Sequence, residues 1–216
     1  MTRKNLFTLA LLGMLAAFVI GTLMYFVNVE KEGQAQAQAN QSKLLRAHAP
    51  TLGKAGAQVV IVEFLDPACE TCAAFYPHVK ELLALHPERV RLVLRYAPFH
   101  KGSDEVVAVL EAARKQGKFW PALEALMLAQ SDWAINHTAQ VARVWKHLEP
   151  LGLDMTQLRA DMASPAIGEI IMQDLDDARA LKVTKTPDFF VNGKPLPSFG
   201  LDQLKKLVNA ELDGAP

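Results

Sequence analysis

The sequence predicts an α/β protein whose elements follow the order βαβ, helical insertion, ββα, behind one N-terminal transmembrane helix. Three observations predict this class: an apolar N-terminal run, a strand-turn-helix-strand succession over residues 58–96, and a return of strand character near residue 188. Half of the 216 residues are apolar, which is enough to bury a sizeable core. We therefore expect one globular domain that carries an insertion.

The N-terminal segment has the features of a signal-anchor. Two basic residues, Arg3 and Lys4, precede an uncharged run from Leu6 to Val27, which has the length of roughly 20 residues that crosses a bilayer. The positive end should stay in the cytoplasm. We interpret residues 1–29 as a cytoplasmic tip and transmembrane helix, so the rest is exported. A cleaved leader is the alternative, because the Ala-Gln-Ala triplets at 35–37 and 37–39 resemble cleavage sites.

Residues 30–43 are expected to form a tether between this helix and the domain. The stretch 34–42 is rich in Gln and Ala and has no aromatic residue, which is typical of a linker or a helical stalk. We expect the folded domain to begin near Leu44. Lys plus Arg and Asp plus Glu number 23 each, so no excess charge indicates nucleic acid as a partner.

The first half of the domain, residues 44–101, contains two expected strands and one helix. Residues 58–65 (QVVIVEFL) and 90–96 (VRLVLRY) are β-branched runs typical of buried strands. A helix is expected from 70 to 85, before the break at His86-Pro87. A strand-helix-strand run of this length predicts a right-handed parallel crossover.

Residues 102–182 are expected to form a helical insertion of four or five helices, with breaks near residues 117, 131–132, 150–152 and 164–165. The second half of the domain, 183–216, begins with strand character at 188–191. Asn192-Gly193 is typical of a type I′ hairpin turn, and residues 194–199 can form the return strand. A helix over 201–212 is expected to close the domain.

The two cysteines, Cys69 and Cys72, are the candidates for chemistry. A helix that opens on a Cys-x-x-Cys motif offers unpaired N–H groups and the positive end of its dipole, which stabilise a thiolate. We expect Cys69 to be the nucleophile and Cys72 to resolve the mixed disulfide. Three alternatives stay open: a structural disulfide, half of a zinc site, and a soft-metal site completed by a histidine such as His78 or His100.

Two segments resemble the DsbA-type branch of the thioredoxin superfamily. VEFLDPACETC is similar to the family's strand-to-active-site segment, and TPDFFVNGK is similar to its cis-proline segment, over a match of roughly residues 58–212. The resemblance implies a thioredoxin fold and a thiol-disulfide oxidoreductase. It also implies a cis bond before Pro187, with Thr186 facing the cysteines and offering its backbone to an extended substrate segment. An ordinary trans turn is the alternative.

The resemblance suggests a role for Glu63, and three other residues are candidates near the site. Glu63 matches a buried acid beneath the active site, where a raised pKa suits proton exchange with Cys72; pairing with Lys or Arg is the alternative. His100 is a possible near-site residue or a surface histidine. The dipeptide Glu70-Thr71 departs from the Pro-His of the strongly oxidising member, and we expect Glu70 to raise the thiol pKa and make the disulfide less oxidising.

The function expected from these features is thiol-disulfide exchange with cysteine-containing exported proteins, by a domain held in the periplasm by an inner-membrane helix. The redox-active pair Cys69–Cys72 requires no metal or dissolved cofactor, but a membrane or periplasmic redox partner must reset it. A soluble periplasmic protein is the alternative location. Copper or mercury binding by the same cysteines, or a docking module with a permanent bridge, are the alternative functions.

Overall fold

The central sheet combines strands from both halves of the chain. The computed structural model describes residues 3–214, with side chains from residue 12 onward, and its main sheet has the order β1-β3-β2-β6-β7. β2 and β3 run parallel, and the other neighbours are antiparallel. The strands are β1 Thr51–Leu52, β2 Val59–Leu65, β3 Val90–Tyr96, β6 Asp188–Val191 and β7 Lys194–Pro195.

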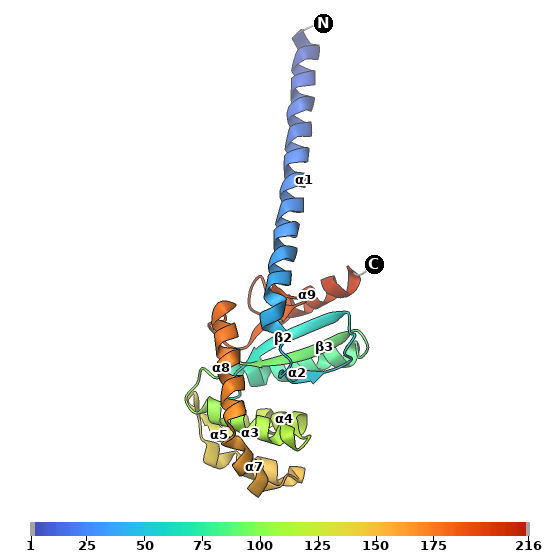
Figure 1. Ribbon diagram of the computed structural model, residues 1–216. Coiled ribbons are helices and arrows are strands. Elements are labelled where there is room, and N and C mark those ends of the chain that lie inside the picture. Colours follow the sequence, from blue (N-terminus) through green and yellow to red (C-terminus); the bar gives the residue numbers. More distant parts are fainter. Residues whose placement is uncertain (1–2, 215–216) are drawn as a thin grey trace.

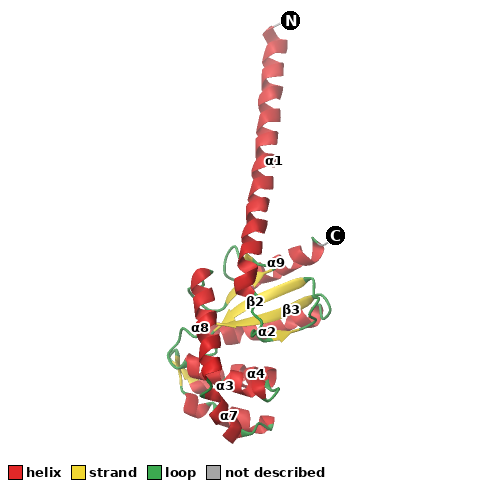
Figure 2. Cartoon of the chain, in the orientation of Figure 1, coloured by secondary structure: helices red, strands yellow, loops and turns green. Residues whose placement is uncertain are grey.

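Helices surround this sheet and build the insertion (Figures 1 and 2). Outside the insertion they are α1 Arg3–Leu44, α2 Glu70–Leu85 and α9 Leu201–Asp213. The insertion contains α3 Ser103–Lys115, α4 Phe119–Leu128, α5 Gln130–Trp133, α6 Trp145–Leu148, α7 Met155–Met162 and α8 Pro165–Ala180. It lies on the side of the sheet away from the N-terminus of α1 (Figure 1). The expected α/β order with a helical insertion is therefore confirmed.

Alternation along β2 decides what each face of the sheet packs against. Val59 and Ile61 lie in a core shared with α2 and α9, whereas Val62 and Phe64 lie in a core with α8 and the end of α1. Because successive strand residues point to opposite faces, Glu63 points toward α2 between apolar neighbours. The acid therefore lies on the face of the sheet that carries the cysteine helix.

Several expectations about short elements were wrong. The return strand expected over 194–199 ends at Pro195, because proline residues at 195 and 197 have no N–H for a strand ladder. The insertion has six α-helices within the described residues and a hairpin of β4 Ala134–Ile135 and β5 Thr138–Ala139. The strands of that hairpin, and β1 as well, are only two residues long. They are too short to show the alternation of side chains that identifies a strand in a sequence.

The tether is helical and docks on the domain. α1 is continuous through residues 30–43, and its stretch Leu12–Leu44 is long and apolar enough to cross a membrane. Asn40 Nδ2 donates to the carbonyl of Gly193 at 3.2 Å, and a Cβ at Gly193 would collide with the Ala37 carbonyl oxygen. Packing against the domain thus begins at Ala37, earlier than the expected start near Leu44.

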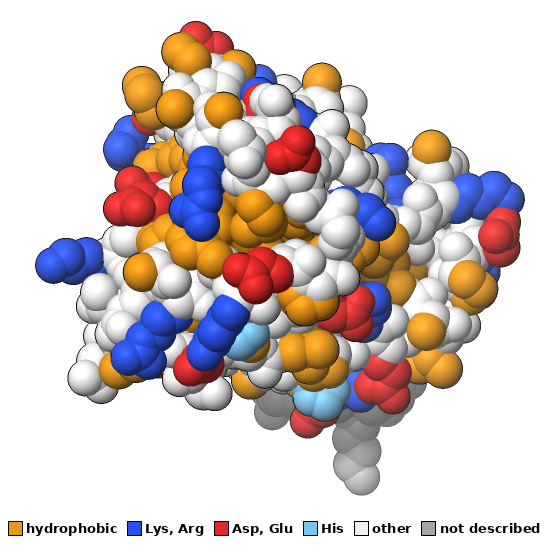
Figure 3. Space-filling view, turned by 90° about the horizontal axis from the view of Figure 1, so that it is seen from below, with side chains coloured by type: hydrophobic (Ala, Val, Ile, Leu, Met, Phe, Trp, Pro, Cys, Tyr) orange, Lys and Arg blue, Asp and Glu red, His pale blue; other side chains and the backbone are white. Residues whose placement is uncertain are grey.

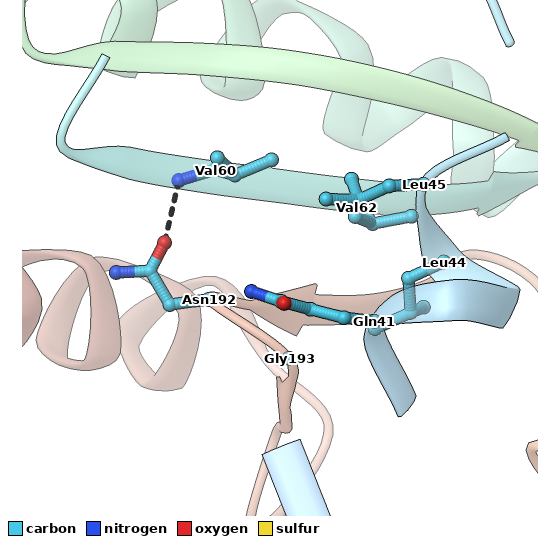
Figure 4. Close-up of a pocket in the computed structure, with 7 residues that line it drawn as sticks. All are labelled: Gln41, Leu44, Leu45, Val60, Val62, Asn192 and Gly193. Atoms are coloured by element: carbon cyan, nitrogen blue, oxygen red, sulfur yellow. Dashed lines mark hydrogen bonds between the residues drawn. The ribbon is translucent and has the colours of Figure 1, made fainter. Parts of the chain in front are cut away.

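The contact between tether and domain is visible in Figure 4, where Gln41 and Leu44 lie beside β2 and the Asn192-Gly193 turn. Both turn residues have positive φ, 48° and 84°, as the type I′ turn expected there requires. The Asn192 side chain accepts a hydrogen bond from Val60 N at 2.8 Å. The side chains of Arg3 and Lys4, the expected cytoplasmic flank, lie outside the described residues.

Surface charge is mixed on the face opposite the N-terminal end of α1. Figure 3 shows apolar side chains gathered in its centre, with acidic and basic side chains scattered around them. This distribution agrees with the equal numbers of acidic and basic residues. This face therefore offers no patch of uniform positive charge to which nucleic acid could bind.

A buried ionic network ties the end of α1 to the sheet and the insertion. Arg95 of β3 is fully buried and donates to Asp174 Oδ1 at 2.6 Å and to Asp177 Oδ2 at 2.7 Å, both on α8. It also donates to the Leu44 carbonyl at 3.1 Å. Arg46 pairs with Asp177 at 2.7 Å. One guanidinium therefore joins three elements that are distant in the sequence.

Candidate active site

The two cysteines open α2 at the junction of sheet and insertion. Cys69 is the N-cap residue with extended backbone (φ −82°, ψ 117°), and the helix starts at Glu70. Both cysteines are thiols and belong to the core that the insertion shares with the end of the sheet. Cys69 is 6% exposed and Cys72 is fully buried, so the first sulfur is the one within reach of solvent.

The turn before Cys69 is held by the buried side chain of Asp66. Its carboxylate accepts hydrogen bonds from the backbone N–H of Ala68 and of His100, each at 2.8 Å, and from the Ser103 hydroxyl. His100 Nδ1 lies 2.6 Å from the same carboxylate. The backbone of Asp66 in turn accepts from Cys69 N at 3.0 Å. His100 thus supports the active-site turn through Asp66, although 22% of its side chain is exposed.

Strand pairing brings the proline segment to the cysteines. β6 pairs with β2 antiparallel, with Phe64 opposite Asp188, so the residues just before β6 lie where β2 ends. The Thr186–Pro187 bond is cis, and the trans alternative is therefore not observed. The Cys69 sulfur lies 3.2 Å from the Thr186 carbonyl oxygen, to which it donates when it is protonated.

The pKa of the Cys69 thiol is lowered to about 5. The hydrogen bond from the Cys72 thiol is the largest cause. Burial opposes it, and hydrogen bonds from Thr186 and from the backbone of Cys72 and Thr71 lower the pKa further. Thr71 thus contributes through its N–H group, since its side chain is exposed. At neutral pH the first sulfur is a thiolate, the nucleophilic form.

Cys72 and Glu63 form the protonated half of the site. Burial, the hydrogen bond it gives to Cys69 and the charge of Glu63 raise the pKa of the Cys72 thiol. Burial, then the charge of Cys69, raises the pKa of Glu63 to about 8. Neither carboxylate oxygen of Glu63 has a hydrogen-bond partner among the described residues. The alternative that Glu63 pairs with Lys or Arg is therefore wrong: its strand neighbours are Leu94 and Phe189.

The insertion adds two side chains that sequence reasoning missed. Gln130 of α5 is 5% exposed and donates to the carbonyls of Pro67 at 2.7 Å and Cys69 at 2.9 Å. His137, between β4 and β5, pairs with Glu70, with Nδ1 3.0 Å from Oε2. Both positions are more than 60 residues beyond Cys69 in the chain. Neighbouring residues in the sequence do not indicate which distant backbone or side chain such a polar residue will contact.

A soft-metal site with a histidine ligand is not formed by the described residues, among which no group of three or more His, Cys, Asp or Glu side chains could hold a metal ion. His78, one suggested third ligand, is exposed on α2 and lies 3.8 Å from Glu81. His100, the other, is bonded to Asp66.

Comparisons with known proteins agree with this geometry. A family model described as thioredoxin matches residues 46–210. The chain is 30% identical over 205 residues to the probable disulfide bond formation protein D of Bacillus anthracis, with 90% of each chain covered. It is 29% identical over 202 residues to the Na(+)/H(+) antiporter NhaA of Herminiimonas arsenicoxydans, but this match covers only 32% of the antiporter. The chain thus spans about a third of that relative.

Solved structures share the fold. A thioredoxin-like oxidoreductase from Silicibacter pomeroyi DSS-3 superposes with a TM-score of 0.70 and 32% identity, covering 81% of this chain and 98% of the other. BdbD from Bacillus subtilis superposes with a TM-score of 0.68 and 23% identity, covering 77% and 94% of the two chains. The second likeness concerns the fold alone.

Proposed function

Because the chain belongs to the thioredoxin family and is of the DsbA type, we propose that it exchanges disulfides with exported proteins through its Cys-Glu-Thr-Cys site. The observation that carries this proposal is the Cys69 thiol, whose pKa is lowered to about 5 at the head of α2 and which contacts Thr186, the residue before the cis-proline. A reactive thiol beside an open backbone edge is what exchange requires.

In the oxidising direction, a substrate thiolate attacks the Cys69 sulfur of the Cys69–Cys72 disulfide. The bond between the two cysteines breaks, a Cys69–substrate disulfide forms, and Cys72 leaves as a thiolate that takes a proton from Glu63. A second substrate thiolate then attacks the substrate sulfur and releases Cys69 as a thiolate. The substrate loses two electrons and the cysteine pair gains them.

The reducing direction is the reverse sequence, in which Cys69 attacks a substrate disulfide and Cys72, giving its proton to Glu63, resolves the mixed disulfide. Thr186 and Pro187 would hold the substrate as an added strand, with backbone hydrogen bonds from Thr186. A second redox protein, in the membrane or the periplasm, would reset the pair after each cycle.

We further propose that α1 anchors the domain to the inner membrane. Its apolar stretch has spanning length, and its C-terminal part is docked on the domain through Asn40 and Gly193. The domain would then lie in the periplasm close to the bilayer. The full chain should stay in the membrane fraction after carbonate extraction; a soluble, shortened chain would instead indicate leader cleavage.

The proposed function is tested by equilibrating the protein with glutathione buffers of graded redox ratio and counting free thiols by alkylation and mass. We expect one reversible two-electron transition, and catalysis of insulin reduction by dithiothreitol. A cysteine pair that stays oxidised at every ratio would contradict the proposal and indicate a permanent bridge. Stoichiometric copper uptake without disulfide exchange would contradict it and indicate a metal-binding protein.

Glu63→Gln is expected to stabilise the reduced protein in mild alkali. The unfolded carboxyl releases its proton near its ordinary pKa of 4.5, whereas the folded one holds it to about 8. Stability therefore falls as pH rises between these values, and the penalty is complete above the folded pKa. Removing the charge should raise the free energy of unfolding at about pH 8 by about 2 kcal/mol, and slow proton-coupled resolution by at least about tenfold.

The matched control is Glu111→Gln, at the other buried glutamate. Glu111 accepts from the Tyr96 hydroxyl at 2.6 Å and from Arg114 at 2.8 Å, so its substitution should destabilise the protein. Urea unfolding at about pH 5 and pH 8 measures both variants. If both variants lost the same stability, the Glu63 carboxylate could not be buried without compensating partners.

A further inference from the structure

Two histidines from different parts of the chain stack beside the active-site turn. The ring centroids of His100 and His137 are 5.2 Å apart, with an interplanar angle of 20°. Each ring has its own carboxylate: His100 Nδ1 lies 2.6 Å from Asp66, and His137 Nδ1 lies 3.0 Å from Glu70. The four side chains thus form a row from the turn before Cys69 to the residue after it.

The position of His137 in its hairpin is an unusual one for a histidine. Asn136 and His137 both have positive φ, 49° and 57°, the pattern of a type I′ turn that favours Asn-Gly. The chain places Asn-Gly at its other such turn, residues 192–193. The turn therefore fixes the point at which the His137 side chain leaves the backbone, at a position that glycine could also occupy.

The hairpin itself is fixed against the active-site side of the molecule. Lys101 and Thr138 form a parallel bridge, and Ala139 N donates to the Lys101 carbonyl at 2.9 Å. A Cβ at Gly102 would lie 3.0 Å from the Ala139 carbonyl oxygen, so the two backbones are in close contact. The insertion can therefore hold an imidazole at a defined place beside Glu70.

We infer that His137 is a positioning residue for the nucleophile: it holds the Glu70 carboxylate, which follows Cys69 directly in the chain. An unpaired carboxylate there would disfavour the Cys69 thiolate by charge repulsion. The His137 ring nitrogen, 3.0 Å from this carboxylate, offsets that effect, and the stack on His100, itself bonded to Asp66, fixes the ring. The inference rests on the proposed function, because it explains how an acidic residue is tolerated between the cysteines.

His137→Gly is the sharpest variant, because glycine suits the turn and should leave the fold at least as stable. We expect the pKa of Cys69, followed by thiolate absorbance in the far ultraviolet, to rise by about half a unit, roughly a threefold change in proton affinity, as one exposed charge produces. His137→Gln should do the same. His147→Gln, at an insertion histidine that pairs with Asp132, should leave the pKa unchanged.

A double-mutant cycle decides whether His137 acts through Glu70. In a Glu70→Gln background, His137→Gly should change the pKa of Cys69 by less than half as much, since the carboxylate that His137 holds is gone. An unchanged pKa in the single variant, or an equal change in both backgrounds, would overturn the inference. The thiol titration needs no substrate. If the double-mutant cycle gives the expected result but the protein does not exchange disulfides, only the proposed function is contradicted.

Discussion

Catalysed disulfide exchange is expected to fall to the uncatalysed rate when Cys69 is replaced by serine. A serine hydroxyl is not ionised at neutral pH and cannot form a disulfide, so neither direction of the reaction can begin. The buried Cys72, whose pKa is raised, cannot replace it as a nucleophile. Insulin reduction and oxidation of a reduced substrate both measure this loss.

Cys72→Ser is the matched control, because it leaves the nucleophile in place and removes the resolving thiol. This variant should attack one substrate disulfide and stop as a mixed disulfide, which mass spectrometry of the non-reduced protein detects. Cys72→Ala, which lacks the donor that a serine hydroxyl keeps, should have a higher Cys69 pKa, since the hydrogen bond from Cys72 is the largest cause of the lowered value. Exchange by Cys69→Ser but not by Cys72→Ser would reverse the assigned roles.

Arg95→Met is expected to destabilise the protein by about 3–5 kcal/mol, the cost of leaving a buried charge without its partner. The guanidinium and Asp174 are both fully buried. Burial works against ionisation of Asp177, but hydrogen bonds from Arg46 and Arg95 outweigh it and hold its pKa below the ordinary value. The loss should therefore shrink as pH falls and Asp177 becomes protonated.

The control for this effect is Arg179→Met. Arg179 pairs with Asp176 at 2.6 Å on the same helix, α8, but the two side chains are 78% and 65% exposed. An exposed pair contributes at most about 1 kcal/mol. Chemical unfolding of both variants at neutral pH makes the comparison, and equal losses would show that the buried network adds nothing beyond a surface ion pair.

The elements that position the cysteines could be predicted from the sequence because their signals are local. The helix over 70–85 and the strand over 90–96 were found at the bounds that α2 and β3 have. A β-branched run, a turn and an apolar helical pattern each lie within about 20 residues, and residues next to one another in the chain decide them.

The partners of the site residues could not be predicted, because they depend on tertiary packing. Gln130 reaches the Cys69 carbonyl across 61 residues, and Arg95 reaches Asp174 across 79. Whether Glu63 has a charged partner depends on the register of the strands, which places Leu94 and Phe189 beside it. The Gln/Ala composition of the tether likewise could not reveal that Ala37 packs on Gly193.

The most direct test of the central claim, that Cys69 is a thiolate at neutral pH, is the pH dependence of its alkylation in the reduced protein. The rate of iodoacetamide modification should rise with an inflection near pH 5, as the lowered pKa of Cys69 predicts, with Cys72 unreactive. An inflection near the ordinary thiol pKa of about 8.5 would contradict the account.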